Sequence, residues 1–199
     1  MSADFSPAWF LPGPHFQTIW GRLVRPRRLV TLRREAIELP DGDELVLDHL
    51  DASSSVPRGS SVPRSSTPTK PEEPEEPEEP RNPHFVLLHG LEGSSQSVYM
   101  QGVLAAIARH GHAATAINFR SCARDPQSLL RMLPNRRPRF YHSGDTADFD
   151  FVVRTLAARM PGAKLVAFGA SLGGNVLLKW LGEHPDQTLI GAAATLSVP

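Results

Sequence analysis

Two kinds of apolar spacing alternate along the second half of the chain. Short runs of consecutive apolar residues, of the length of buried strands, are expected to form β-strands. They lie at 85–88, 113–119, 165–168 and 190–198. Segments with apolar residues at helical spacing separate them, at 97–110, 143–160 and 172–184. This alternation predicts right-handed crossovers and a parallel sheet covered by helices on both faces.

The first half begins with a different pattern. Two strand-like runs, 29–39 and 44–50, are joined by Pro40-Asp41-Gly42-Asp43. Asp-Gly between β-rich runs is typical of a hairpin, so an antiparallel hairpin is expected at one edge of the sheet. A short helix is expected near residues 14–20. Between the second and third helices, Arg120 to Tyr141 is expected to be a long loop, and Ser143 is a candidate N-cap.

Residues 51–83 interrupt the pattern. They hold 8 of the 19 prolines, many serines and three Glu-Glu-Pro repeats, with almost no large apolar side chain. Such a segment cannot bury enough apolar surface to offset its ordering entropy, so it is predicted to be a disordered or polyproline-like insertion. The expected organisation is an N-terminal extension and hairpin at 1–50, this insertion at 51–83, and a core of alternating strands and helices at 84–199.

Composition narrows the function classes. The formal net charge is zero among 199 residues, which favours neither a nucleic-acid partner nor an anionic membrane. The single cysteine excludes an internal disulfide framework. No basic, apolar leader opens the chain, and no run approaches 18 apolar residues, so neither a signal peptide nor a transmembrane segment is expected. The expected location is the cytoplasm.

The pentapeptide Gly169-Ala170-Ser171-Leu172-Gly173 lies between a predicted strand and a predicted helix. A Gly-x-Ser-x-Gly in this context is typical of a nucleophile elbow, a turn so sharp that its flanking residues must be tiny. The turn exposes the serine oxygen beside the N-terminus of the following helix, where a developing oxyanion is stabilised. A tight turn with an idle serine is the structural alternative.

His89-Gly90-Leu91-Glu92-Gly93 follows the apolar run 85–88. In α/β-hydrolases a His-Gly at this place opens the loop that supplies the second oxyanion donor. The expected donors are the backbone N–H groups of Leu91 and Leu172. His89 is expected to order this loop by hydrogen bonding rather than to transfer protons. No metal site is predicted.

The histidine that a serine nucleophile needs is missing from the expected place. In this fold the chain order is serine, then acid, then histidine. His184 alone lies beyond Ser171, 13 positions further along the predicted helix. At a rise of about 1.5 Å per residue it would lie about 20 Å away, too far to act as a base.

Six motifs in order resemble the YheT-like branch of the α/β-hydrolases, which includes the eukaryotic ABHD esterase and lipase relatives. They are Pro14-His15-Phe16-Gln17-Thr18, Leu39-Pro40-Asp41-Gly42-Asp43, His89-Gly90-Leu91-Glu92-Gly93-Ser94, Asn118-Phe119-Arg120-Ser121-Cys122, Tyr141-His142-Ser143-Gly144-Asp145-Thr146-x-Asp148 and Gly169-Ala170-Ser171-Leu172-Gly173-Gly174-Asn175. The resemblance implies an α/β-hydrolase fold with a mostly parallel sheet, incomplete at its C-terminal end.

The resemblance also implies hydrolysis of carboxylic esters, small or lipid-like, without a cofactor, with peripheral membrane contact left open. Carried over by position, Ser171 is the nucleophile, with His89, Gly90, Gly169 and Gly173 supporting the loop and the elbow. Because the family continues well past Pro199, the chain is expected to be a truncated product that lacks the acid and the histidine. Two other functions remain open: a non-catalytic hydrolase-like binding module, and a thioesterase or another acyl-transfer enzyme.

Overall fold

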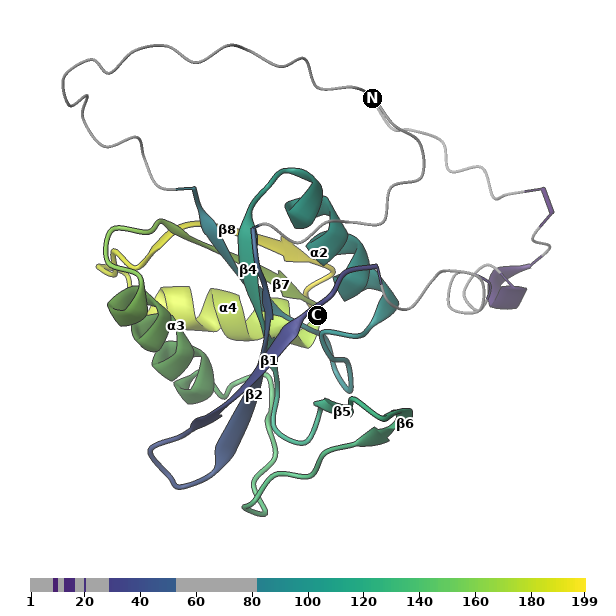
Figure 1. Ribbon diagram of the computed structural model, residues 1–199, viewed down its shortest axis with the longest axis horizontal. Coiled ribbons are helices and arrows are strands. Elements are labelled where there is room, and N and C mark those ends of the chain that lie inside the picture. The colour runs from purple at the N-terminus through teal and green to yellow at the C-terminus, as the bar shows by residue number, and fades with distance from the viewer. Residues whose placement is uncertain (1–8, 11–12, 17–19, 21–28, 53–81) are drawn as a thin grey trace, which may run out of the picture.

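The computed structural model describes residues 9–10, 13–16, 20, 29–52 and 82–199 (Figure 1). Most of the predicted insertion at 51–83, and part of the predicted helix near 14–20, lie outside the described residues. Within the part that the structure describes, every helix is too short or too polar to span a lipid bilayer.

A six-stranded sheet with the order β1-β2-β4-β3-β7-β8 forms the centre of the molecule. Its strands are β1 (Arg33–Glu38), β2 (Glu44–Leu50), β3 (His84–Leu88), β4 (Ala113–Asn118), β7 (Leu165–Ala170) and β8 (Ile190–Leu196). β1 and β2 form an antiparallel hairpin, and β2 pairs antiparallel with β4. The pairs β4–β3, β3–β7 and β7–β8 are parallel. The predicted mostly parallel sheet with an antiparallel edge hairpin is confirmed.

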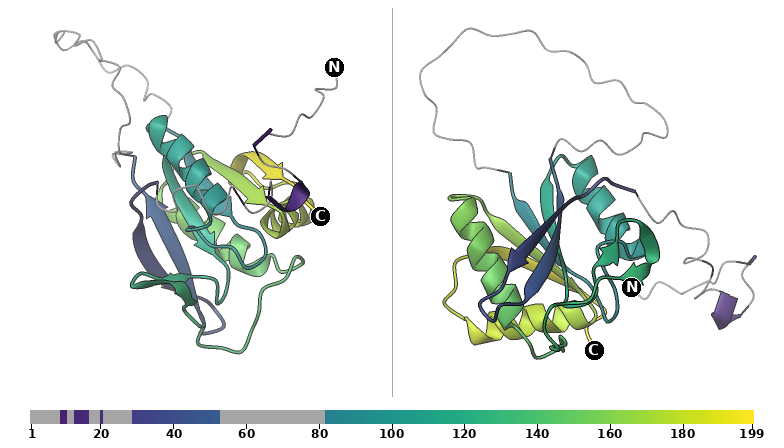
Figure 2. Two further views of the ribbon diagram at one scale, coloured as in Figure 1. Left: turned by 90° about the vertical axis from the view of Figure 1, so that its right-hand side faces the viewer. Right: turned by 60° about the horizontal axis from the view of Figure 1, so that its bottom comes forward.

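Helices cover both faces of this sheet (Figures 1 and 2). On one face, α3 (Ala147–Arg159) and α4 (Leu172–Glu183) bury Phe149, Val152 and Trp180 in the larger core cluster. On the other face, α2 (Val98–Arg109) buries Met100 and Leu104 in a second cluster. The carboxyl ends of β3, β4 and β7 meet at one edge of the sheet, because parallel strands end on the same side.

Three local predictions were wrong. The segment 120–141 contains a small hairpin, β5 (Arg124–Asp125) and β6 (Ser128–Met132), where a loop was expected. The third helix begins after Thr146 rather than Ser143, because residues 142–145 form a turn in which the Asp145 N–H donates to the His142 carbonyl. The last strand ends at Leu196, since Ser197 has a φ of 50° and leaves the extended conformation.

Candidate functional site

Ser171 lies in the turn between β7 and α4, with a φ of 49° and a ψ of −120°. Few L-residues adopt this left-handed conformation, which costs on the order of 1–3 kcal/mol. Two hydrogen bonds hold the turn: the Ser171 N–H donates to the Leu196 carbonyl on β8, and the Asn175 N–H donates to the Ser171 carbonyl. The Ser171 side chain is partly exposed rather than packed in the core.

The glycines on both sides of Ser171 let the turn close. At position 169, the Cβ of an alanine would lie 2.6 Å from the Gly173 carbonyl oxygen and 2.7 Å from the Gly174 Cα. At position 173, it would lie 2.5 Å from the His89 carbonyl oxygen and 2.7 Å from the Leu88 carbonyl oxygen. These contacts are with backbone atoms, which cannot turn aside. Only glycine fits at either position.

The loop between β3 and α2, residues 89–97, lies against this turn. At position 90, an added Cβ would lie 3.2 Å from the Ser171 Cβ and 3.5 Å from the Ala170 carbonyl oxygen. The structure therefore brings together Gly90, Gly169, Ser171 and Gly173, which the sequence analysis had singled out. We call residues 89–97 the β3–α2 loop.

His89 is fully buried at the start of the β3–α2 loop. Its Nδ1 lies 2.7 Å from the Gly90 carbonyl oxygen and its Nε2 accepts the Phe119 N–H at 3.0 Å. Burial lowers the pKa of His89 to about 4, although the Gly90 carbonyl opposes the shift. A carbonyl oxygen can only accept a hydrogen bond, so Nδ1 carries a proton and donates that bond to Gly90. Nε2 accepts the Phe119 N–H and therefore carries no proton, so the imidazole is neutral.

Leu91 and Leu172 each carry a backbone N–H without an acceptor among the described residues. Leu172 is the first residue of α4, where N–H groups have no partner within the helix. The Leu91 side chain is 69% exposed, so packing does not hold it in place. Among the described residues, no protein acceptor therefore engages either of these two N–H groups.

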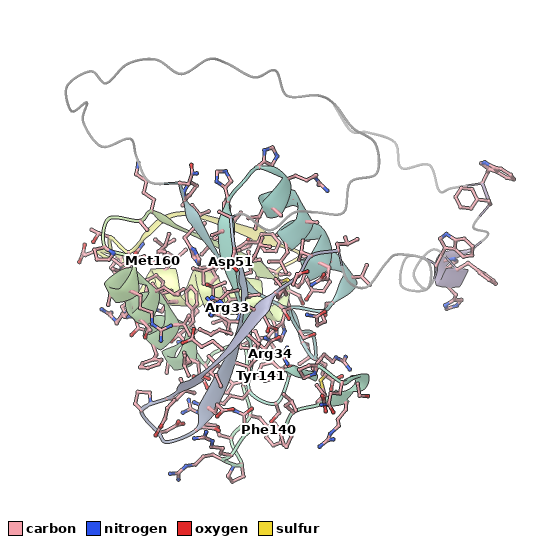
Figure 3. All side chains as sticks on the ribbon, in the orientation of Figure 1. Arg33, Arg34, Asp51, Phe140, Tyr141 and Met160 are labelled. Atoms are coloured by element: carbon pink, nitrogen blue, oxygen red, sulfur yellow. The ribbon has the colours of Figure 1, made fainter. Side chains whose placement is uncertain are left out.

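Two tyrosines bind the β3–α2 loop, and the sequence analysis missed this role for both of them. The Gly90 N–H donates to the Tyr99 hydroxyl at 2.7 Å, and the Glu92 N–H donates to the Tyr141 hydroxyl at 2.7 Å. Tyr141 stacks on Phe119, the residue after β4, whereas its neighbour Phe140 is 76% exposed; both are labelled in Figure 3. The tyrosines are 42 positions apart in the sequence, so no local pattern could have paired them.

A buried polar network fastens the far end of the same loop. Asp48 on β2 accepts hydrogen bonds from the Ser95 hydroxyl at 2.5 Å and the Asn118 amide at 2.9 Å. The Asn118 side-chain oxygen accepts the Ser95 N–H at 2.9 Å. Arg34 donates to both Asp48 carboxylate oxygens. Burial alone would raise the pKa of Asp48, but the bonds from Arg34, Ser95 and Asn118 lower it.

Arg120, two residues beyond β4, is the second buried charged centre near this edge. Its guanidinium donates to both oxygens of Asp148 at 2.7 Å and to Asp43 at 2.6 Å. Asp41 lies 2.9 Å from the same guanidinium. Burial would raise the pKa of Asp43, but bonds from Glu44, Asn135, Arg120 and Arg136 lower it to about 2. The cluster ties the β1–β2 turn to the first turn of α3.

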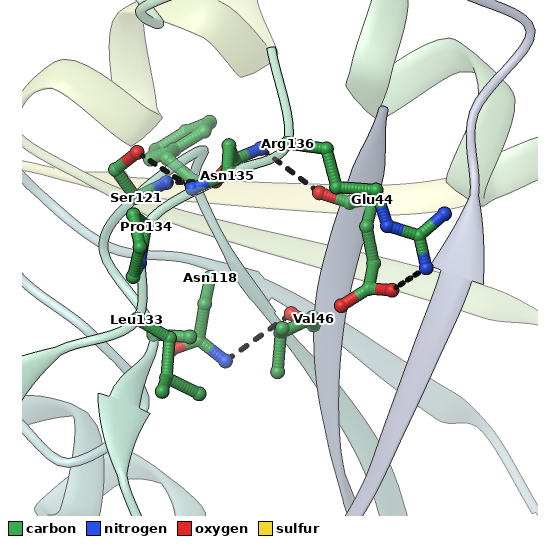
Figure 4. Close-up of a pocket in the computed structure, with 10 residues that line it drawn as sticks. Glu44, Val46, Asn118, Ser121, Leu133, Pro134, Asn135 and Arg136 are labelled. Carbon is green, nitrogen blue, oxygen red and sulfur yellow. Dashed lines mark hydrogen bonds and ion pairs between the residues drawn. The ribbon is translucent and has the colours of Figure 1, made fainter. Parts of the chain in front are cut away.

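A small cavity of about 40 Å³ lies beside this cluster, between β2 and the segment 133–136 (Figure 4). Asn118 borders it and donates to the Val46 carbonyl, while Asn135 donates to the Glu44 carbonyl. Its size suits an ordered water rather than a substrate. Elsewhere, among the described residues, no three His, Cys, Asp or Glu side chains gather as a metal site requires.

Two curated relatives match nearly the whole chain. One, from Escherichia coli (strain K12), is named "Putative esterase YheT" and is 32% identical over 198 residues, covering 100% of this chain and 49% of its own length. The phospholipase ABHD3 of Mus musculus is 31% identical over 182 residues, covering 92% of this chain and 38% of its own length. The chain thus spans about half the length of these relatives or less.

A solved structure shares the fold. That of XC6422 from Xanthomonas campestris, described as an α/β serine hydrolase without a lid, superposes with a TM-score of 0.54 at 17% identity. It covers 84% of this chain and 62% of its own. At the level of protein families, residues 83–198 match the family described as the alpha/beta hydrolase fold. The chain therefore belongs to the α/β-hydrolase fold family.

Proposed function

We propose that the protein is a serine hydrolase of carboxylic esters and that Ser171 is its nucleophile. The observation that carries the proposal is the left-handed turn at Ser171, closed by Gly169 and Gly173 against the β3–α2 loop. A strained, partly exposed serine beside the β3–α2 loop favours exposure of its oxygen over a packing role. Relatives named as an esterase and a phospholipase support an ester or lipid ester as substrate.

In the proposed reaction, Ser171 Oγ attacks the ester carbonyl carbon and loses its proton to a general base. The carbonyl oxygen becomes an oxyanion, which the Leu91 and Leu172 N–H groups stabilise by hydrogen bonding. The bond to the alcohol oxygen then breaks, and the base returns the proton to the departing alcohol. Water then takes the place of the alcohol: the base removes a proton from it, and its oxygen attacks the acyl carbon. The bond to Ser171 Oγ breaks, the base returns the proton to Oγ, and the carboxylic acid is released.

We propose that the general base belongs to sequence that follows this chain in the full-length protein. The described residues show no hydrogen bond between Ser171 Oγ and a histidine. His184 lies at the C-terminal end of α4, where its Nδ1 donates to the Trp180 carbonyl at 2.9 Å. The first curated relative is about twice as long as this chain, which leaves room for an acid and a histidine.

The test is covalent labelling of the full-length protein with a fluorophosphonate, followed by hydrolysis of esters of increasing acyl length. Ser171→Ala should abolish both labelling and turnover. Ser197→Ala is the matched control, because Ser197 also has a positive φ, 50°, and is exposed outside the elbow. Unchanged labelling in Ser171→Ala would reject the proposal. Faster turnover of thioesters than of oxygen esters would reassign the substrate class.

A further inference from the structure

Both tyrosines of the chain bind the same short stretch of backbone. The sequence holds two tyrosines in 199 residues, Tyr99 and Tyr141. Tyr99 belongs to the first turn of α2, and Tyr141 precedes α3, so they approach the β3–α2 loop from different elements. Each hydroxyl accepts one backbone N–H at 2.7 Å, from Gly90 and from Glu92 respectively. Leu91 lies between these two residues.

Hydrogen bonding accounts for three of the four N–H groups from Gly90 to Gly93. Tyr99 takes that of Gly90, Tyr141 takes that of Glu92, and the Gly93 N–H donates to the Gly90 carbonyl at 3.0 Å. In this stretch the Leu91 N–H alone has no acceptor among the described residues. The Gly90 and Glu92 N–H groups are already hydrogen-bonded, so they cannot compete with the Leu91 N–H for an acceptor.

The orientation of the Leu91 N–H follows from the planarity of the peptide bond. In a trans peptide, the N–H points opposite to the preceding carbonyl. The preceding carbonyl is that of Gly90, which His89 Nδ1 and the Gly93 N–H both contact. The planes before and after are held by Tyr99 and Tyr141. Three consecutive peptide planes are therefore fixed, although the Leu91 side chain is largely exposed.

We propose that Tyr99 and Tyr141 are positioning residues that hold the β3–α2 loop so that, of the four N–H groups from Gly90 to Gly93, that of Leu91 is the one left for the oxyanion. This inference rests on the proposed function of Ser171. Both hydroxyls act as neutral acceptors. Burial raises the pKa of each, that of Tyr141 to about 12, with the neighbouring Cys122 adding to the shift. Removing either hydroxyl leaves one backbone N–H without its acceptor, and that group can then compete with the Leu91 N–H for the oxyanion. The peptide plane that carries it is also no longer held in place.

The test uses Tyr99→Phe and Tyr141→Phe in the full-length protein, because phenylalanine keeps the ring and removes one hydroxyl. We expect kcat to fall about tenfold in each variant with KM within about twofold, since a misaimed donor loses part of the transition-state stabilisation. Affinity for an alkyl boronic acid, which forms a tetrahedral adduct with serine, should fall by the same factor. Thr155→Val, which removes a half-buried hydroxyl from α3, is the matched control and should change neither value.

Ser171→Ala separates this inference from the proposed function. If Ser171→Ala is inactive while both tyrosine variants keep kcat and boronate affinity within about twofold, the positioning role is overturned and the nucleophile stands. If Ser171→Ala keeps its activity, both fail. Amide hydrogen exchange gives a measurement without turnover: exchange should accelerate about tenfold at Gly90 in Tyr99→Phe and at Glu92 in Tyr141→Phe. Unchanged exchange at both positions would overturn the inference.

Discussion

The Phe119 N–H donates to Nε2 of His89 across 3.0 Å, and the two rings meet edge to face with their centroids 4.8 Å apart. This contact joins the residue after β3 to the residue after β4 at the edge of the sheet where Ser171 lies. It exists only while Nε2 is unprotonated, because a protonated imidazole has no acceptor. The geometry of the loop is therefore linked to the charge of His89.

Acidification should destabilise the folded chain between about pH 6.5 and pH 4. Burial lowers the pKa of His49, His84 and His89, for the last two to about 4, whereas an unfolded histidine titrates near 6.5. Within this window the unfolded state binds protons that the folded state does not, so the free energy of unfolding falls as pH falls. Each histidine lowers the free energy of unfolding by at most about 1.4 kcal/mol for each unit by which the pH falls.

Urea unfolding at pH 7.5, 6 and 5 measures this effect. Carboxylates contribute little there, because the pKa of Asp43 is about 2 and those of Asp48 and Glu35 are also lowered. Their stabilising effect is lost only at lower pH. An unfolding free energy that stays constant from pH 7.5 to 5 would contradict the neutral, buried state of these histidines.

Replacing Gly173 with alanine should destabilise the chain by about 1–3 kcal/mol or more, as overpacking against atoms that cannot move does. The new Cβ would lie 2.5 Å from the His89 carbonyl oxygen, so the elbow and the β3–α2 loop must separate. Gly182→Ala is the matched control on the same helix, since nothing lies within 4 Å of its Cβ. It should be neutral or stabilise by up to about 1 kcal/mol through helix propensity.

Thermal unfolding of the two variants tests this difference. Loss of fluorophosphonate labelling should accompany the loss of stability in Gly173→Ala alone. Equal unfolding temperatures for Gly173→Ala and Gly182→Ala would show that the contact between the elbow and the β3–α2 loop does not require glycine.

Replacing Arg120 with leucine should cost about 3–5 kcal/mol, the usual penalty for breaking a buried ion pair. Asp43 is fully buried and Asp148 nearly so, and both would lose their cation. Arg159→Leu makes the same change of charge and residue at an exposed position, where the arginine pairs with Glu35. That variant should lose less than about 1 kcal/mol. Similar unfolding free energies for the two variants would contradict a structural role for the Arg120 cluster.

Much of the fold could be predicted from the sequence because its causes lie in residues close to one another along the chain. The alternation of apolar runs and helical spacing predicted β3, β4, β7 and β8 and the helices between them, and the structure confirms these elements. The turn at Ser171 could be predicted because its causes, Gly169 and Gly173, lie within two residues of it. The catalytic roles of Ser171, Leu91 and Leu172 stay predictions.

Interactions between distant residues explain what the sequence could not reveal. Arg120 meets Asp43 from 77 positions away, and no local pattern distinguishes it from the exposed arginines of the following loop. Tyr141 was placed at the end of a loop, yet its hydroxyl contacts Glu92 across 49 positions. The β5–β6 hairpin was missed because β5 is two residues long and shows no apolar alternation.

Because the Ser171 backbone is strained, we expect substitutions there to change stability and activity independently of each other. Its φ of 49° lies where an L-residue pays a conformational penalty and glycine does not. Ser171→Gly and Ser171→Ala both remove the hydroxyl, so both should abolish labelling by a fluorophosphonate. Glycine also relieves the strain, whereas alanine retains it. Ser171→Gly should therefore be more stable than Ser171→Ala by about 1 kcal/mol, after allowance for the larger entropy of glycine in the unfolded chain.

Urea unfolding of both variants and the wild type, at one pH near neutrality, measures this difference. Ser197→Gly and Ser197→Ala form the matched pair, since Ser197 has a φ of 50° without a proposed role in catalysis. If the glycine variants gain stability at both positions, the strain comes from the backbone conformation itself. Ser171 would then occupy a conformation that costs stability, and the benefit of a serine there would be its exposed oxygen. If Ser171→Gly proves less stable than Ser171→Ala, the turn is not strained, and the main argument for Ser171 as the nucleophile is lost.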